Sequence, residues 1–307
     1  MTRTGLVSIV MCAWKPRGDW FRDAVSSVLD QRDLEFELVL VDDGSPEPVE
    51  SLLDPTDDPD GRIRLVRIEH AGLAAARNAG IAMARGSWFR FVDADDVLEP
   101  NSTARLVALS DGGRWITYGT TALCDAQMRP TGMKRSTLAG SIARECLLYR
   151  FDVRHMSMVF PRAVVEAVGP WDTTLRQCQD WDFVLRALEQ APARGEAAIA
   201  TYYRRHGEAV SANVARAVDY ETLVVDRYFA RHPEEAGTEI EREARAKLLL
   251  VRAKAAPALG MGRRERLAHV ARAAGLHPRR TAEEVGRDAY WASRAAAGTA
   301  ARRLGLR

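Results

Sequence analysis

The first hundred residues alternate short apolar runs with amphipathic segments. Consecutive apolar positions are typical of strands buried on both faces, whereas apolar residues three or four apart are typical of helices. The pattern predicts strands at Leu6–Met11, Glu35–Val41, Ile63–Ile68 and Ser87–Val92, and helices at Trp20–Leu29 and Leu73–Ala84. Strands separated by helices of this length form βαβ units. We therefore predict an α/β fold with a mainly parallel sheet flanked by helices.

After residue 115 the pattern is less regular. It predicts strands at Trp115–Leu123, Ser157–Phe160 and Ala197–Tyr203, and helices at Arg162–Val168 and Trp181–Glu189. Beyond Ser211 only helical spacing remains, over Ala215–Ala230, Glu239–Ala255, Arg263–Ala274 and Thr281–Ala301. We therefore expect two parts, an α/β catalytic domain over residues 1–215 and an all-helical C-terminal extension over residues 216–307.

The composition is that of a globular protein, with 47% hydrophobic and 28% charged residues. Its four cysteines lack metal-ligand spacing, which argues against a structural zinc site or a disulfide scaffold. No apolar run approaches the roughly 20 residues of a membrane span, and the N-terminus lacks the apolar stretch of a signal peptide. We therefore expect a reduced, cytoplasmic enzyme.

The net charge of +2 is unevenly distributed. Residues 241–307 hold 16 of the 44 basic and 6 of the 42 acidic residues, a net charge of +10. Tyr290 and Trp291 lie in the last predicted helix, and a basic helix with aromatic side chains can lie in an anionic membrane interface. We instead expect helices that pack on the protein or form a homodimer. Peripheral membrane contact at the inner face is the alternative, and we expect no nucleic-acid partner.

Carboxylates follow two of the predicted strands, at Asp42–Asp43 and at Asp93–Asp96. Parallel sheets bind ligands beyond the carboxyl ends of their strands. No glycine-rich phosphate loop, H-E-x-x-H or G-x-S-x-G motif is present. Carboxylates repel a phosphate, so they suit a phosphate site only when a divalent cation such as Mg²⁺ or Mn²⁺ bridges the carboxylates and the phosphate. The D-A-D-D segment meets this requirement, with Asp96 free to cap the next helix, although a lone D-x-D is more often a turn.

Several segments, in this order, resemble the family 2 glycosyltransferases of the GT-A fold. They are V-S-I-V-M at 7–11, F-E-L-V-L-V-D-D-G-S at 36–45, G-L-A-A-A-R-N-A-G at 72–80, W-F-R-F-V-D-A-D-D at 88–96, Q-D-W-D-F-V-L-R at 179–186 and Y-R-R-H-G-E-A-V-S at 203–211. The resemblance covers about residues 5–212. It implies an inverting transferase that uses a nucleoside-diphosphate sugar, with UDP- or dTDP-sugars favoured, and Mn²⁺ or Mg²⁺.

The resemblance also implies roles for individual residues. Asp43 would bond the imide of the base, Asp93 the ribose or diphosphate, and Asp95 and His206 the cation. The other residues expected to bind the nucleotide sugar are Ala13, Trp14, Arg77, Ala94 and Arg204. Simpler interpretations stay open: Asp43 as a turn cap, Trp14 as a core residue and Arg77 in an exposed salt bridge.

Asp180 is the predicted catalytic base. Inverting transfer is a single displacement, so the acceptor must lose a proton as it attacks, and a carboxylate within reach can take it. Asp180 opens a predicted helix, whose N-terminus favours the ionised form. Gln179 and Trp181 are candidate acceptor contacts, although the family usually has Glu at position 179. The acceptor could be a saccharide, a lipid-linked saccharide or a small natural product.

Two other functions fit parts of the pattern. A sugar nucleotidyltransferase is also α/β with acidic metal ligands, but it would need a glycine-rich basic loop after the first strand. Residues 11–20, which follow that strand here, are a poor substitute for such a loop. A nucleotide-sugar-binding protein without transferase activity is the other alternative, and Gln179 is the only hint of it.

Overall fold

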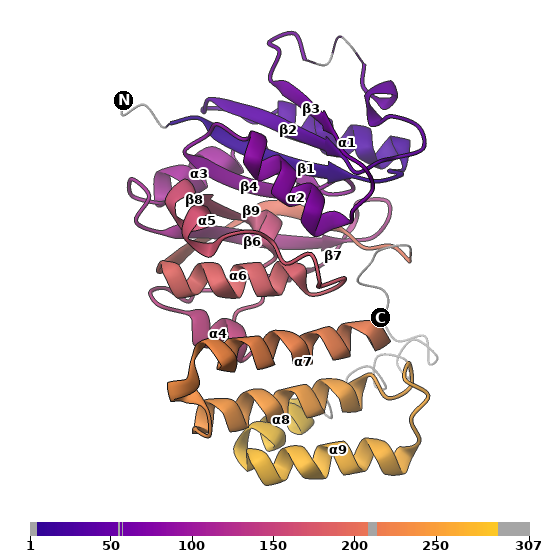
Figure 1. Ribbon diagram of the computed structural model, residues 1–307, viewed down its shortest axis with the longest axis vertical. Helices are drawn as coiled ribbons and strands as arrows, with labels where there is room; N and C mark the ends of the chain where they lie inside the picture. The colour runs from indigo at the N-terminus through magenta and orange to yellow at the C-terminus, as the bar shows by residue number, and fades with distance from the viewer. Residues whose placement is uncertain (1–4, 55, 57, 208–213, 288–307) are drawn as a thin grey trace, which may run out of the picture. The chain divides into compact units, whose positions relative to one another are not determined.

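The chain divides into two compact units, Met1–Ala212 and Asn213–Arg307. The computed structural model describes residues 5–54, 56, 58–207 and 214–287 (Figure 1). Within these residues every strand belongs to the first unit, and the second is helical.

The first unit is built on one mixed sheet. Its strand order over the described residues is β3-β2-β1-β4-β8-β6-β9-β5, and β7 pairs with β6. The strands are β1 (Val7–Ala13), β2 (Phe36–Asp42), β3 (Ile63–Arg67), β4 (Trp88–Asp93), β5 (Val97–Leu98), β6 (Ile116–Cys124), β7 (Pro130–Lys134), β8 (Met158–Pro161) and β9 (Ala193–Arg204). Strands β3, β2, β1 and β4 are parallel, as are β6 and β9, whereas β8 is antiparallel to its neighbours β4 and β6.

Helices flank the parallel strands on both faces. The helices of the first unit are α1 (Gly18–Leu29), α2 (Leu73–Met83), α3 (Ser102–Leu109), α4 (Ala143–Leu147), α5 (Arg162–Val168) and α6 (Gln179–Gln190), with short 3-10 turns η1 (Val49–Leu52) and η2 (His155–Ser157). On one face, α1 packs its apolar side against Ile9 and Met11 of β1. On the other, α2 lies so close that a Cβ on Gly80 would come within 2.4 Å of Val10.

The predicted α/β class, with parallel strands, flanking helices and C-terminal helices, is confirmed. Most predicted elements of the first unit form within a few residues of their expected ends. The short elements β5, β7 and α4 were not predicted. The expectation that Asp96 caps the next helix is wrong: β5 intervenes, α3 begins only at Ser102, and Asp96 instead accepts the backbone N–H of Arg204 at 2.8 Å.

The register of the sheet brings the strand ends together. Ala13 at the end of β1 pairs with Asp42 of β2, and Cys12 pairs with Asp93 of β4. The hydrogen bond between Asp96 and Arg204 joins the end of β9 to the turn that follows β4. The ends of β1, β2 and β9 and the turn after β4 therefore lie together at the carboxyl ends of the parallel strands.

Arg90, in the middle of β4, is fully buried, and within the described part of the chain no carboxylate accepts a hydrogen bond from its guanidinium. Burial lowers the pKa of its guanidinium to about 9, so the group is still a cation at pH 7. All five of its N–H groups are matched by neutral oxygens. The acceptors are the carbonyls of Met156 and Ala200 and the hydroxyls of Ser102, Thr103 and Thr201, at 2.6–3.1 Å. One side chain thus ties β4 to η2, α3 and β9.

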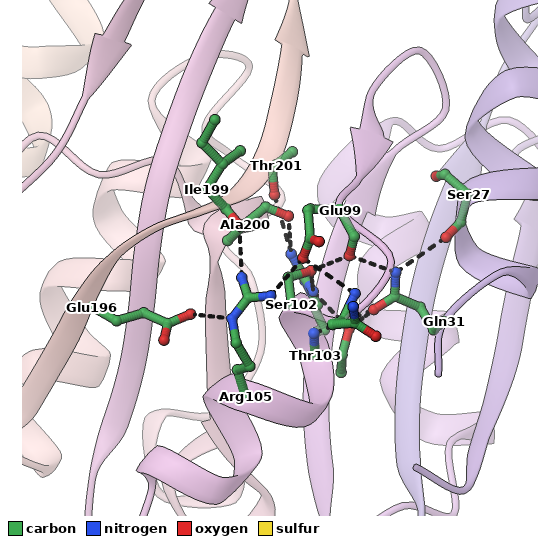
Figure 2. Close-up of polar contacts among 12 residues, drawn as sticks. Ser27, Gln31, Glu99, Ser102, Thr103, Arg105, Glu196, Ile199, Ala200 and Thr201 are labelled. Carbon is green, nitrogen blue, oxygen red and sulfur yellow. Dashed lines mark hydrogen bonds and ion pairs between the residues drawn. The ribbon is translucent and has the colours of Figure 1, made fainter. Parts of the chain in front are cut away.

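A second arginine reinforces this junction from the surface. Arg105 of α3 donates to Glu196 and to the carbonyl of Ile199, both on β9, each at 2.8 Å. It also pairs with Glu99 at 2.7 Å. Figure 2 shows these contacts beside Ser102 and Thr103, with the backbone of β9 passing over the start of α3.

The second unit contains α7 (Val214–Arg231), η4 (Pro233–Glu235), α8 (Glu239–Lys254), α9 (Arg263–Leu276) and helical residues 278–287. The rest of the helix predicted to end at Ala301, with Tyr290 and Trp291, lies outside the described residues. None of the helices in the described ranges is long and apolar enough to cross a membrane.

A buried ion cluster joins the helices of this unit. Glu284 accepts from Lys247 at 3.0 Å, Arg287 at 3.1 Å and Lys254 at 3.2 Å, and pairs with Arg280 at 3.3 Å. Burial works to raise the pKa of Glu284, but the hydrogen bonds and charges of Lys247 and Lys254 outweigh it and lower the pKa to about 2. Part of the positive charge of residues 241–307 is therefore paired with a buried carboxylate inside the unit.

We predict that Arg90→Met lowers the free energy of unfolding of the first unit by about 3–5 kcal/mol. The substitution leaves buried hydroxyls and carbonyls without their donor, and such losses are strongly destabilising. The half-buried Arg105 is a matched control, for which Arg105→Met should cost about 1 kcal/mol or less. Urea titration followed by tryptophan fluorescence measures both. Equal losses for the two variants would show that Arg90 is not the principal tie.

Candidate functional site

Asp43 holds the loop that leads into α2. Its carboxylate accepts the backbone N–H groups of Ala71 at 2.8 Å and Gly72 at 3.0 Å, and its Oδ2 lies 3.0 Å from Nδ1 of His70. Gly44 follows with φ +69°, and a Cβ there would lie 2.6 Å from the backbone nitrogen of His70. Only glycine fits this turn. The carboxylate has roughly four acceptor positions, so about one stays available to a ligand.

Trp14 lies beside this loop, directly after β1. Its side chain is 48% exposed and stacks on the imidazole of His70, with ring centroids 4.5 Å apart and planes within 17°. Trp14 is therefore not a core residue. The preceding residue, Ala13, is buried, and its carbonyl accepts the backbone N–H of Asp43 at 2.9 Å.

Arg77, on α2, is buried and fixes Asp93. Its Nη2 donates to Oδ1 of Asp93 at 2.7 Å and lies 3.1 Å from Nε2 of His155. Its guanidinium also lies over the ring of Trp171, 4.3 Å from the centroid. Burial works to raise the pKa of Asp93, but the charge and hydrogen bond of Arg77, together with the nearby His155 and Arg154, outweigh it and lower the pKa. The alternative that Arg77 forms an exposed salt bridge is therefore wrong.

Asp95 and His206 are joined by a hydrogen bond of 2.8 Å between Oδ2 and Nε2. Burial and the nearby charge of Asp93 raise the pKa of Asp95, against the effect of His206. Two neighbouring ligands of a six-coordinate ion with bonds of about 2.1 Å lie about 3.0 Å apart, so this pair fits a divalent cation with little movement. In the described part of the chain, no three His, Cys, Asp or Glu side chains form a metal cluster.

Arg204 is engaged in structural contacts. Its guanidinium is buried and donates to the carbonyls of Asp95 and Ala126, both at 2.9 Å, and to the carboxylate of Asp23 at 2.9 Å. We therefore expect Arg204 to hold the 94–96 turn, with partly buried Ala94, in place. Its neighbour Arg205 is exposed.

Asp180 lies in the first turn of α6, as predicted, with a side chain that is 36% exposed. Its Oδ2 is 3.8 Å from Nδ1 of His155, while Nε2 of the same ring is 3.9 Å from Oδ1 of Asp93. A single imidazole therefore separates the two carboxylates. The charges of Asp180 and Asp152 raise the pKa of nearby Arg154, outweighing the opposite effect of burial.

The two residues expected to contact the acceptor are bonded to backbone carbonyls. Trp181 donates its indole N–H to Cys146 at 3.2 Å and packs against Tyr149, with ring centroids 4.7 Å apart. The amide of Gln179 donates to the carbonyl of Leu175.

The structure thus gathers the predicted donor-site residues at one sheet edge and places Asp180 beside them. His70, His155 and Arg154 were not predicted to belong to this region. The signal for the last two lies in R-H-M-S-M-V-F, where two basic residues lie three and four residues before the buried strand β8. Nothing in the sequence indicates that His70 stacks on Trp14.

Comparison with known proteins identifies related chains. Residues 8–160 match the model of Glycosyl transferase family 2. A PGL/p-HBAD biosynthesis glycosyltransferase of Mycobacterium bovis is 30% identical over 172 residues, 53% of this chain and 62% of that protein. The succinoglycan biosynthesis protein ExoO of Rhizobium meliloti is 35% identical over 106 residues, 34% of this chain and 30% of that protein. The chain thus spans less than two thirds of the length of both relatives.

Solved structures share the fold. S. aureus TarS 1-349 matches with a TM-score of 0.60 at 13% identity, covering 90% of this chain and 82% of that one. The same protein in complex with UDP-GlcNAc matches with a TM-score of 0.56 at 16% identity, covering 92% of each chain. The expected GT-A type of fold is confirmed by this likeness.

Proposed function

This chain belongs to glycosyltransferase family 2, and we propose that it moves a sugar from a nucleoside-diphosphate donor to an acceptor hydroxyl or amine, with inversion at the anomeric carbon. UDP- or dTDP-sugars are the proposed donors, because the remaining acceptor position of Asp43 suits the imide N–H of uracil or thymine. The complex of TarS with UDP-GlcNAc supports a UDP-sugar.

One observation carries this proposal: a single histidine ring separates Asp93, at the donor edge of the sheet, from Asp180 at the start of α6. A donor bound along the strand ends would thus bring its anomeric carbon close to a half-exposed carboxylate. A general base is useful only within hydrogen-bond reach, directly or through one water, of the group that it deprotonates.

The donor would be held by residues that the fold already fixes. Trp14 offers an exposed ring for stacking on the base. Asp93, kept ionised and oriented by Arg77, would accept hydrogen bonds from the ribose. When bound, Mn²⁺ or Mg²⁺ would be held by Asp95 and His206 and would neutralise charge on the diphosphate. The exposed Arg205 could add a positive charge to the departing diphosphate.

In the proposed reaction Asp180 accepts the proton of the acceptor as the acceptor oxygen or nitrogen attacks the anomeric carbon. The bond between that carbon and the diphosphate breaks, and its electron pair leaves with the diphosphate. We propose a saccharide, a lipid-linked saccharide or a small natural product as the acceptor.

We propose that the helices of residues 216–307 form a packed appendage of a cytoplasmic enzyme. The buried cluster around Glu284 supports this, because it uses four basic side chains to hold helices together. Membrane contact remains the alternative, since α9 exposes Arg263, Arg264 and Leu267.

The function is tested by incubating the full chain with Mn²⁺ and a panel of UDP- and dTDP-sugars, and measuring release of nucleoside diphosphate. We expect slow hydrolysis of one donor, with water as acceptor. Nucleotide binding without hydrolysis or transfer would favour a binding protein, and formation of a nucleotide sugar from a sugar phosphate would favour a nucleotidyltransferase.

We predict that Asp95→Ala abolishes the metal-dependent part of UDP binding and leaves the fold intact. In calorimetric titrations with UDP, Asp95→Ala in the presence of Mn²⁺ should bind as weakly as the wild type does when EDTA has removed the metal. Asp226→Ala removes an exposed carboxylate that pairs with Arg245 at 2.8 Å in the second unit, and it is the matched control. Unchanged binding of UDP and Mn²⁺ by Asp95→Ala would place the cation elsewhere.

We predict that Asp180→Asn lowers donor turnover by about 10²–10⁴-fold, the usual cost of losing a general base. UDP affinity should be unchanged, because Asp180 does not hold the nucleotide. Asp182→Asn is the control on the same helix: Asp182 is buried and paired with Arg186 at 2.8 Å, so its loss should reduce stability far more than turnover. Near wild-type turnover by Asp180→Asn would exclude it as the base.

We predict that the full chain does not sediment with anionic phosphatidylglycerol vesicles at low or high salt. Its packed helices should keep their apolar sides away from lipid. Arg264→Glu should then behave as the wild type does. Sedimentation that falls as salt rises, and is weakened by Arg264→Glu, would instead support membrane contact through α9.

A further inference from the structure

His155 is a buried histidine that has no role in the proposed reaction so far. Among the proposed nucleotide-binding residues it lies beside Arg77 and Asp93. It is 3% exposed and lies in η2, with its ring between Asp93 and Asp180. Both of its neighbours along the ring edge are carboxylates, but only one of its nitrogens has a hydrogen-bond partner.

The contact with Arg77 determines which nitrogen of His155 carries the proton. A guanidinium has only donors, so Nε2, at 3.1 Å from Nη2 of Arg77, must accept. Burial and the charge of Arg77 lower the pKa of His155 to about 4, and the ring is neutral at pH 7. A neutral ring that accepts at Nε2 carries its hydrogen on Nδ1.

This Nδ1–H is buried and has no hydrogen-bond partner. An unpaired buried donor costs stability, so it needs an acceptor. Oδ2 of Asp180 lies 3.8 Å away, and a movement of about 1 Å would form an ordinary hydrogen bond. Catalytic hydrogen bonds are often long in free enzymes and shorten when substrate binds.

The ring of His155 is held in place by buried contacts, whereas the side chain of Asp180 is partly exposed. The next residue, Met156, accepts through its carbonyl from Arg90 at 3.1 Å and from Thr201 at 2.9 Å. The edge of the ring also packs on Trp171, with centroids 5.8 Å apart. Asp180 is more than one-third exposed, so the movement would come from the carboxylate.

We propose that His155 is a positioning residue, which donates its Nδ1–H to Oδ2 of Asp180 and so directs the other carboxylate oxygen toward the acceptor. The proposal rests on the proposed role of Asp180 as general base. Through Arg77, the same ring connects Asp180 to Asp93, so that the donor-binding carboxylate and the base are held by one buried unit.

Two substitutions separate this role from a purely structural one. In His155→Asn the side-chain amide takes about the place of Nδ1 and keeps a donor toward Asp180, but it loses the contact with Arg77. In His155→Gln the amide oxygen takes about the place of Nε2 and keeps the contact with Arg77, but nothing donates to Asp180. The positioning role predicts that Asn rescues turnover and Gln does not, and a structural role predicts the reverse.

We expect His155→Gln to lower kcat for donor hydrolysis about 10–100-fold, as is typical when a group that orients a functional residue is lost. Affinity for UDP with Mn²⁺ should stay unchanged.

The outcomes distinguish this proposal from the function on which it rests. No turnover of any donor by the wild type, or normal turnover by Asp180→Asn, overturns the general base and this proposal together. Loss of turnover in Asp180→Asn, with wild-type kcat in His155→Gln, overturns the role of His155 alone. Greater loss in His155→Asn than in His155→Gln does the same, because His155 would then act by holding Arg77. Thermal unfolding shows that each variant is folded.

Discussion

The buried guanidinium of Arg90 is the constraint on which the rest of the first unit depends. A buried cation that donates no hydrogen bond to a carboxylate is stable in a protein interior only when other oxygens surround it closely. Here those oxygens come from η2, α3 and β9, segments that the chain reaches as late as residue 201. The hydrogen bonds that Arg90 needs therefore fix two parts of the site. One is the second half of β9, which leads to His206, and the other is the carbonyl of Met156, next to His155.

The carboxylates at the sheet edge depend on this frame. Each is held by a different kind of partner: Asp43 by backbone N–H groups, Asp93 by a buried arginine and Asp95 by a histidine. Repulsion between them is reduced by these partners, and a cation with a diphosphate would reduce it further. The arrangement explains how a negatively charged edge can serve a negatively charged donor.

Local patterns predicted the strands, the carboxylates at their ends and the start of α6, because each depends on neighbouring residues. Contacts between residues far apart in the chain could not be predicted from such local patterns. The apolar run that contains Arg90 predicts a strand but not the five distant oxygens around the guanidinium, and Asp96 was assigned to a helix cap when its partner lies 108 residues away. The exposed strand β7 was missed because P-T-G-M-K lacks regular alternation. His155 gave no periodic signal, since its role depends on groups from α2 and α6.

The most direct test of the account is diffraction at the manganese edge from crystals of the full chain grown with UDP and Mn²⁺. The account predicts one anomalous peak about 2.0–2.4 Å from both Asp95 and His206, a uracil ring stacked on Trp14, and Asp180 open toward the side on which a sugar would lie. Manganese bound away from these two ligands, or a nucleotide bound away from the carboxyl ends of the strands, would contradict it.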